Sequence, residues 1–146
     1  MQVAIRAYTF SNTVESVPKA RRSVHKILRA CKYDSDLIDT ALLCTSELVT
    51  NAVMHATVAP TFTVLCRLRI DMMTLGVVDR DPRLPRKLDI CEDDGFGRGL
   101  LLVESLSDEW GIEERRHGKM VFVRLKVASP RTPAEIHEPK TTPCFT

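Results

Sequence analysis

The longest uninterrupted helical pattern in the sequence runs from Asp34 to about Ala56 and reads DSDLIDTALLCTSELVTNAVMHA. Asp34 or Ser35 can cap its start, and such a helix is roughly 34 Å long at 1.5 Å per residue. Its apolar residues recur with the helical period and form one stripe: Leu37, Ile38, Ala41, Leu42, Leu48, Val49, Ala52 and Val53. A helix this long needs a broad surface to cover, which predicts that it lies on a β-sheet.

Two polar residues, Glu47 and Asn51, lie one turn apart on this predicted helix and outside its apolar stripe. Asparagine is a poor residue for a helix interior because its side chain competes with the backbone for hydrogen bonds. Two interpretations stay open at this point. The pair faces water together with Thr50 and Met54, which is the commoner case for a lone Glu/Asn pair, or it lines a site; His55, one turn further on, fits a helix end better than a ligand.

Alternating apolar residues predict five strands and helical spacing predicts two further helices. The strands are expected at Val3–Phe10, Pro60–Ile70, Met73–Asp79, Trp110–Arg116 and Met120–Val127, with a turn at His117, Gly118 and Lys119 joining the last two. The helices are expected from Ser16 to about Cys31 and from about Gly99 to Ser107, the second burying Leu100, Leu101, Val103 and Leu106. This order predicts an α+β fold, a two-layer α/β sandwich in which three helices cover one face of a mixed five-stranded sheet.

Two segments carry no regular pattern. Residues Arg80 to Phe96 contain two prolines and an acidic cluster, which indicates an irregular loop whose length suits a functional lid. From Ala128 onward the chain holds four of its eight prolines and no periodicity, so we expect a disordered or loosely attached tail.

Composition excludes several classes of protein. A chain of 146 residues is the size of one domain, and a net charge of +2 is too small to predict nucleic acid or an anionic membrane as partner. The basic residues of the first helix are expected to be a solvated surface rather than a binding patch: Lys19, Arg21, Arg22, Lys26 and Arg29. No apolar run approaches the roughly 20 residues of a membrane span, and the first residues lack an export signal, which favours the cytoplasm.

The five cysteines are widely spaced and odd in number, and no two form a C-x-x-C pair: Cys31, Cys44, Cys66, Cys91 and Cys144. This pattern is typical neither of a disulfide framework nor of a zinc site. We expect reduced cysteines that mostly pack in the interior.

Two more features can carry chemistry. The run GFGRGL, from Gly95 to Leu100, precedes the predicted third helix, and its glycines allow backbone N–H groups to turn toward an anion. A helix entry that needs unusual backbone conformations would look the same, and the run matches neither the dinucleotide fingerprint nor a P-loop. Asp79 ends the VVD strand, where an aspartate is also a common start of a turn.

In order and spacing, these features resemble the GHKL ATP-binding fold, also called the Bergerat fold, from about Ala20 to Leu125. Three segments resemble sequences of the bacterial anti-sigma factor and serine-protein kinase branch of this histidine kinase-like ATPase superfamily: SELVTNAVMHA, GRGLLLVESLSDEWG and GKMVFVRL. The resemblance implies a histidine kinase-like ATP-binding domain at residues 1–127 and a proline-rich tail at residues 128–146. No phospho-accepting histidine segment precedes the domain, so a self-contained histidine kinase is not expected.

The resemblance implies ATP and Mg²⁺ as cofactors, with a role for each element. Glu47 would be the general base, Asn51 would coordinate Mg²⁺, and Asp79 would accept a hydrogen bond from the adenine amino group. The backbone N–H groups of Gly97, Arg98 and Gly99, at the helix entry that continues with Leu100, would hold the phosphates. Lys119 would add positive charge nearby.

The first glycine box departs from the family pattern. The superfamily usually has D-x-G-x-G, whereas this sequence has Asp79, Arg80, Asp81, Pro82 and Arg83, so both glycines are missing. Proline and bulky side chains limit how closely this loop approaches a nucleotide.

Three functions are therefore compared. The first is an anti-sigma-type serine/threonine protein kinase that acts on a small antagonist protein, with a sigma factor as possible second partner and a homodimer as possible assembly. The second is an inactive nucleotide-binding or protein-interaction module, which the altered glycine box favours. The third, a nucleic-acid binder using the basic first helix, is least favoured.

Overall fold

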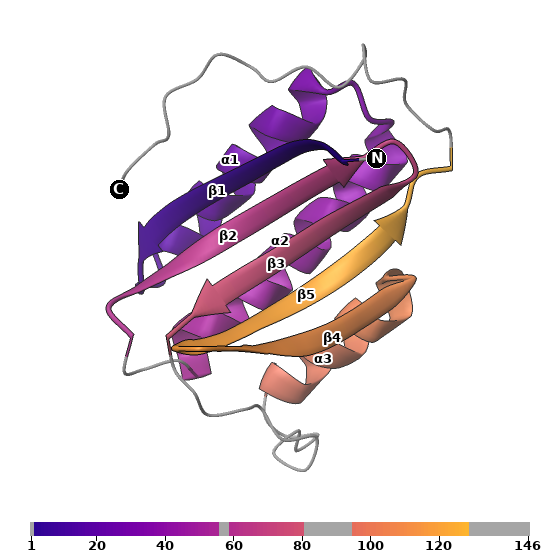
Figure 1. The fold of residues 1–146 in the computed structure, drawn as a ribbon. Helices are drawn as coiled ribbons and strands as arrows, with labels where there is room; N and C mark the ends of the chain where they lie inside the picture. Colours follow the sequence, from indigo (N-terminus) through magenta and orange to yellow (C-terminus); the bar gives the residue numbers. More distant parts are fainter. Residues whose placement is uncertain (1, 56–58, 81–94, 129–146) are drawn as a thin grey trace.

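The computed structural model describes residues 2–55, 59–80 and 95–128 (Figure 1). The elements along the chain are β1 (Gln2–Ser11), α1 (Ser16–Ala30), α2 (Ser35–His55), β2 (Thr61–Arg69), β3 (Met72–Asp79), α3 (Gly95–Leu106), β4 (Glu109–Arg115) and β5 (Gly118–Lys126). This order of strands and helices is the predicted one. The expected lid at residues 81–94 and the expected tail at residues 129–146 lie outside the described residues.

The five strands form one sheet in the order β1-β2-β3-β5-β4, which confirms the predicted number. Every neighbouring pair in this sheet is antiparallel, so the prediction of a mixed sheet is wrong. The reason is the place of β5. The connection through α3 makes β4 run in the direction of β3, but the terminal hairpin inserts β5 between them, and the two parallel strands never pair.

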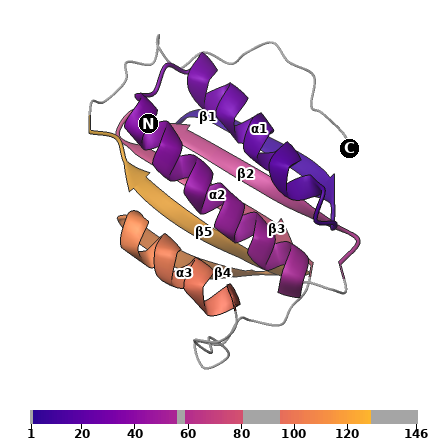
Figure 2. The same ribbon diagram turned by 180° about the vertical axis from the view of Figure 1, so that it is seen from behind.

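The helices all cover one face of the sheet, as predicted. Figure 2 shows α2 lying between α1 and α3, and α2 packs on β3 and β5, near the centre of the sheet. The inner face of the sheet and the apolar stripes of the helices form one core, in which Phe10 and Phe62 stack at 5.7 Å between ring centroids.

The central helix α2 begins where its capping residue predicts. The Asp34 carboxylate accepts a hydrogen bond from the Leu37 N–H at 2.9 Å, which satisfies one of the free donors of the first turn. Most of the predicted stripe is buried: Ile38, Ala41, Leu48, Val49 and Ala52. By length and composition alone α2 could also cross a membrane, but a core helix passes the same test and the stripe of α2 packs on the sheet.

The third helix differs from its prediction at one end and on one face. It begins at Gly95 instead of Gly99, so the glycine run lies within its first turns. Val103 is fully buried and Leu106 packs on the core, but Leu101 is 55% exposed, and its predicted burial is wrong. The reason is geometric, because residues two apart on a helix point in different directions and Val103 already faces the sheet.

The last strand begins earlier than predicted. Gly118 and Lys119 belong to β5, so the turn between β4 and β5 consists of Arg116 and His117. Lys119 is held in the ladder because it pairs with Asp79 on β3 and with Glu114 on β4.

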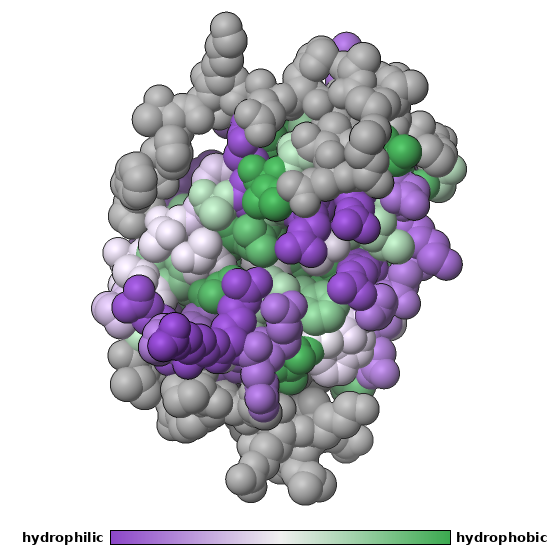
Figure 3. All heavy atoms as spheres, in the orientation of Figure 1, coloured by the Kyte–Doolittle hydropathy of each residue, from purple (hydrophilic) through white to green (hydrophobic). Residues whose placement is uncertain are grey.

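The other face of the sheet carries none of the described helices and is shown in Figure 3. Its middle is an apolar row in which Leu65, Gly76 and Phe122 are neighbours on adjacent strands. Arg124 lies over the Phe122 ring at 4.9 Å and pairs with Glu109 at 2.8 Å. Long charged side chains therefore cover part of this apolar surface.

Candidate functional site

The predicted site residues gather at one end of the sandwich. The register places the end of β3 between the start of β2 and the start of β5, with Asp79 opposite both Phe62 and Lys119. Figures 1 and 2 show that the last turn of α2 and the first turn of α3 lie at this same end. Segments far apart in the sequence thus meet where β3 stops.

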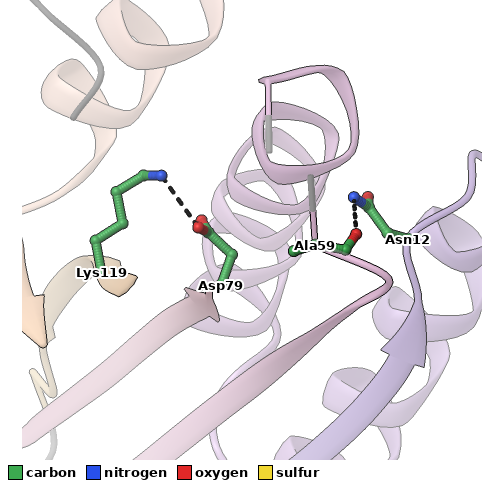
Figure 4. A network of polar contacts seen from close by, with 4 residues as sticks. All are labelled: Asn12, Ala59, Asp79 and Lys119. Atoms are coloured by element: carbon green, nitrogen blue, oxygen red, sulfur yellow. Dashed lines mark hydrogen bonds and ion pairs between the residues drawn. The ribbon is translucent and has the colours of Figure 1, made fainter. Parts of the chain in front are cut away.

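Asp79 and Lys119 form a buried ion pair at this end (Figure 4). The Lys119 Nζ atom donates to Asp79 Oδ1 at 3.0 Å, and the two side chains are only 8% and 3% exposed. Burial of two charges costs solvation energy that the attraction between them barely offsets, so such a pair adds little net stability. The pair does, however, place a buried donor beside a buried acceptor at hydrogen-bond distance.

Gly118 allows this ion pair to form. A Cβ atom at Gly118 would overlap the carbonyl oxygen of Asp79 and come within 2.7 Å of the Cα atom of Arg80. The glycine therefore lets the start of β5 press against the end of β3, which brings the next residue, Lys119, beside Asp79.

Figure 4 also shows how the adjoining loop is held. The side-chain amide of Asn12, just after β1, donates to the carbonyl oxygen of Ala59 at 2.8 Å, and its backbone N–H donates to the carbonyl oxygen of Pro60 at 3.0 Å. These bonds fix the segment that enters β2, whose Phe62 is the other strand neighbour of Asp79.

The polar pair on α2 does not simply face water. Thr50 and Met54 are exposed, but Glu47 and Asn51 are half-buried. The Asn51 Oδ1 atom has almost no accessible surface and no hydrogen-bond partner in the described part of the chain. A buried carbonyl oxygen without a donor is costly, and such an atom in a native fold calls for an explanation. Ser46 Oγ is also buried without a partner, but it points about 140° away around the helix.

Cys44 lies one turn before Glu47 on the buried side of α2. Burial, and secondly the nearby Glu47 carboxylate, raise the pKa of its thiol to about 11. The thiol is therefore protonated at neutral pH and is a poor nucleophile.

The backbone of the glycine run forms the first turns of α3. Because α3 begins at Gly95, its free N–H groups belong to the turn around Gly95–Gly97. The N–H groups of Arg98, Gly99 and Leu100 fall in the part of the helix where N–H groups bond within the helix. Arg98 and Gly99, which the sequence analysis placed at the helix entry, thus lie about one turn inside α3.

Two contributions to the site were missed in the sequence, namely the contact of Gly118 and the pairing of Lys119 with Asp79. A signal was available. The alternation of Val121, Val123 and Leu125 extends back by two residues and places Lys119 on the buried face of the last strand. The alternation does not, however, indicate which strand lies next to β5, so it could not predict that Lys119 meets Asp79.

Comparisons with known proteins concern the fold and the family of the chain. Among curated proteins, none matches the sequence at a significant level. The fold is similar to a crystal structure of the RsbU and RsbW domains of a Mycobacterium tuberculosis protein, with a TM-score of 0.63 and 19% sequence identity. That match covers 85% of this chain but only 32% of the other, so this chain spans about a third of that chain's length.

The sequence also matches a family model. Residues 10–125 fit the family described as histidine kinase-like ATPase domain, and this range runs from the end of β1 nearly to the end of β5. It contains Glu47, Asn51, Asp79 and Lys119 together with the glycine run. The chain therefore belongs to the histidine kinase-like ATPase domain family, the group of nucleotide-binding domains that the GHKL resemblance pointed to.

Proposed function

We propose that the chain is an ATP-binding regulatory protein of the anti-sigma type, which transfers the γ-phosphate of ATP to a serine or threonine of a small antagonist protein. The observation that carries the proposal is the buried, unpartnered Oδ1 atom of Asn51, on the same face of α2 as Glu47. A buried oxygen atom without a hydrogen-bond donor is better explained as a ligand for a cation than as part of a solvated surface. Phosphoryl transfer requires positioning and charge stabilisation, which this small set of groups can supply.

The residues of α2 would carry the chemistry. Glu47 would take the proton from the attacking hydroxyl of the partner protein. Asn51 would hold Mg²⁺, because a hard cation prefers oxygen ligands and Asn51 offers an oxygen with no donor among the described residues. When bound, Mg²⁺ would neutralise charge on the phosphates.

The ends of β3 and α3 would hold the nucleotide. Asp79 would accept a hydrogen bond from the adenine amino group at the buried end of β3. The free N–H groups at the start of α3, around Gly95–Gly97, would bind the phosphates with the help of the helix dipole, and Arg98 and Gly99 would continue this turn into the helix. The ATP-binding domain would span residues 1–127.

The similarity to a structure that includes an RsbW domain supports a place in the anti-sigma branch. We propose a small antagonist protein as phospho-acceptor, a sigma factor as alternative partner, and homodimers as a possible assembly, all in the cytoplasm. Neither nucleic acid nor a membrane is proposed as a direct partner.

An inactive module is the second candidate. The stretch after Asp79 lacks the two glycines of the usual first glycine box, as Arg80, Asp81, Pro82 and Arg83 show. In this second candidate, Asp79 would still bind the adenine base, but the stretch after it would not close over the phosphates. Nucleotide would then order a docking surface for a partner without any transfer.

Calorimetric titration with ATP, with and without Mg²⁺, tests the nucleotide site. We expect the wild-type protein to bind ATP and Asp79→Asn to lose most of the affinity, because the amide replaces an acceptor with a group that also donates. Asp39→Asn, at an exposed position of α2, makes the same chemical change away from the site and should bind as the wild type does. If millimolar ATP does not bind, the proposal fails.

Transfer is tested with radiolabelled ATP and a candidate antagonist protein. Glu47→Ala should abolish phosphorylation while ATP remains bound, and Glu104→Ala, at an exposed position of α3, should leave it intact. Phosphorylation by the Glu47→Ala protein would contradict the role of this residue. Binding without transfer in the wild type would favour the inactive module.

A further inference from the structure

The buried Lys119, at the start of β5 and beside the end of β3, has no role in the chemistry described above. We propose that Lys119 reads the nucleotide base together with Asp79: the Asp79 carboxylate accepts from the exocyclic amino group, and the Lys119 ammonium donates to the adjacent ring nitrogen, N1 of adenine. This inference rests on the proposed function, since it requires that the base bind at Asp79.

The position of the ammonium group carries the argument. Lys119 Nζ lies 3.0 Å from Asp79 Oδ1, so a strong donor and a strong acceptor stand side by side at hydrogen-bond distance. The edge of adenine presents the complementary doublet, an amino donor next to an unprotonated ring nitrogen. A base can therefore bond to both groups without separating the ion pair. An ammonium tied to Asp79 lies at the base end of the site, rather than among the phosphates where the sequence resemblance put its charge.

The two groups are also held rigidly. Asp79 is flanked in the ladder by Phe62 and Lys119, and Lys119 by Asp79 and Glu114, so neither residue lies on an edge strand. Both side chains are nearly inaccessible to water. In such a buried environment polar contacts are stronger, and unsatisfied polar groups are costly. The backbone positions of both groups are therefore set by the sheet before a ligand arrives.

The doublet predicts selection of adenine against guanine. In the same pose, guanine would place its O6 acceptor against the Asp79 carboxylate and its N1–H donor against the Lys119 ammonium. Both contacts become repulsive, and a site that leaves buried polar groups unpaired rejects such an analogue strongly. Asp79 alone would supply only one of these two discriminating contacts.

The test compares ATP with 1-deaza-ATP, which lacks the N1 acceptor but keeps the amino group, by calorimetry in the presence of Mg²⁺. The wild-type protein should prefer ATP by about 10- to 100-fold, as expected for the loss of one hydrogen bond to a charged donor. In Lys119→Met this preference should nearly vanish, and rejection of GTP should weaken. Lys119→Gln, which keeps a donor, should restore part of the preference for ATP over 1-deaza-ATP.

Lys126→Met is the matched control, because it removes an exposed lysine from the far end of the same strand. It should keep the full preference for ATP. Equal affinity of the wild type for ATP and 1-deaza-ATP overturns the inference, even if Lys119→Met does not fold. An unchanged preference in folded Lys119→Met, with binding that still requires Asp79, also overturns it and leaves the ion pair a structural contact. If no nucleotide binds to the wild type, the proposed function and this inference fail together.

Discussion

At Gly118 the main chain of β5 touches the main chain of β3. No side chain can be accommodated there, since even a Cβ atom would meet the carbonyl oxygen of Asp79. The atoms in the way belong to the backbone of a central strand, which cannot move without distorting the ladder that also holds Lys119. The geometry of the ion pair thus depends on the absence of a side chain at the preceding residue.

We expect Gly118→Ala to lower the free energy of unfolding by about 1–3 kcal/mol, the usual cost of forcing extra atoms into a packed site. It should also weaken ATP binding, because it separates Lys119 from Asp79. Urea denaturation measures the first effect and calorimetry the second. Gly76→Ala is the control: a Cβ there meets mainly the flexible side chain of Met120, which can shift, so its cost should be smaller. Equal stability of Gly118→Ala and the wild type would contradict the close contact.

At the residue level, the sequence predicts those site residues that look out of place locally. Asn51 stands out because asparagine is unfavourable inside a helix, and Glu47 stands one turn before it. Asp79 marks the end of a strand. The pairing of Asp79 with Lys119 was not predicted, since the two residues are 40 positions apart and meet only through the strand order.

Among the elements, α2 positions more of the site than any other, and its start is defined by one hydrogen bond. Asp34 accepts from the Leu37 N–H, whereas α1 begins at Ser16 after Glu15, whose side chain makes no capping bond. The two helix starts therefore differ in what their capping side chains contribute.

We expect Asp34→Ala to destabilise the fold by about 1 kcal/mol, the typical value of a capping side chain. Glu15→Ala should change the stability by much less, because no capping bond is lost. Thermal and urea denaturation of both variants measure the difference. If the two variants were equally stable, the capping bond of Asp34 would contribute nothing.

Helices and strands were predicted best where a regular period runs unbroken. The stripe of α2 and the alternation in β2 each identify an element and its buried side. The starts of α3 and β5 were placed too late because glycine suggests a loop in a sequence, while in this fold Gly95 is the first residue of a helix and Gly118 the first residue of a strand. The burial of Leu101 was also predicted wrongly, since the sequence of a short, strongly apolar helix does not show which of its leucines stays exposed.

For the whole molecule, the sheet order could not be read from the sequence. Each strand is recognisable alone, but insertion of β5 between β3 and β4 depends on contacts between distant segments. The helix between β3 and β4 does make these two strands parallel, but no parallel pair results. They are simply not neighbours.

The core should become less stable in alkaline solution. Burial, and secondly the neighbouring Cys31, raise the pKa of the Cys66 thiol from 9.0 to about 12. Between these two values the unfolded chain has lost a proton that the folded chain keeps, so the free energy of unfolding falls as the pH rises. One thiol contributes a slope of at most about 1.4 kcal/mol per pH unit.

Urea denaturation between pH 8 and pH 10.5 measures this slope. Cys66→Ala should be less stable at every pH because it leaves a cavity, but its stability should fall less steeply above pH 9. Lysine and tyrosine side chains titrate in both proteins and cancel in the comparison. Parallel curves for the two proteins would show that the Cys66 thiol does not titrate differently on folding.

The position of β5 in the sheet affects how the protein folds during its synthesis. The strand that is made last among the described elements lies inside the sheet and joins β4 to β3. A nascent chain that has emerged only as far as β4 therefore has an unpaired inner edge on β3, where Asp79 still lacks its lysine. Pairings between distant segments form slowly and leave open edges exposed meanwhile. If the proposed base site is correct, recognition of a nucleotide base begins only when the final hairpin closes, so that binding itself reports a completed sheet.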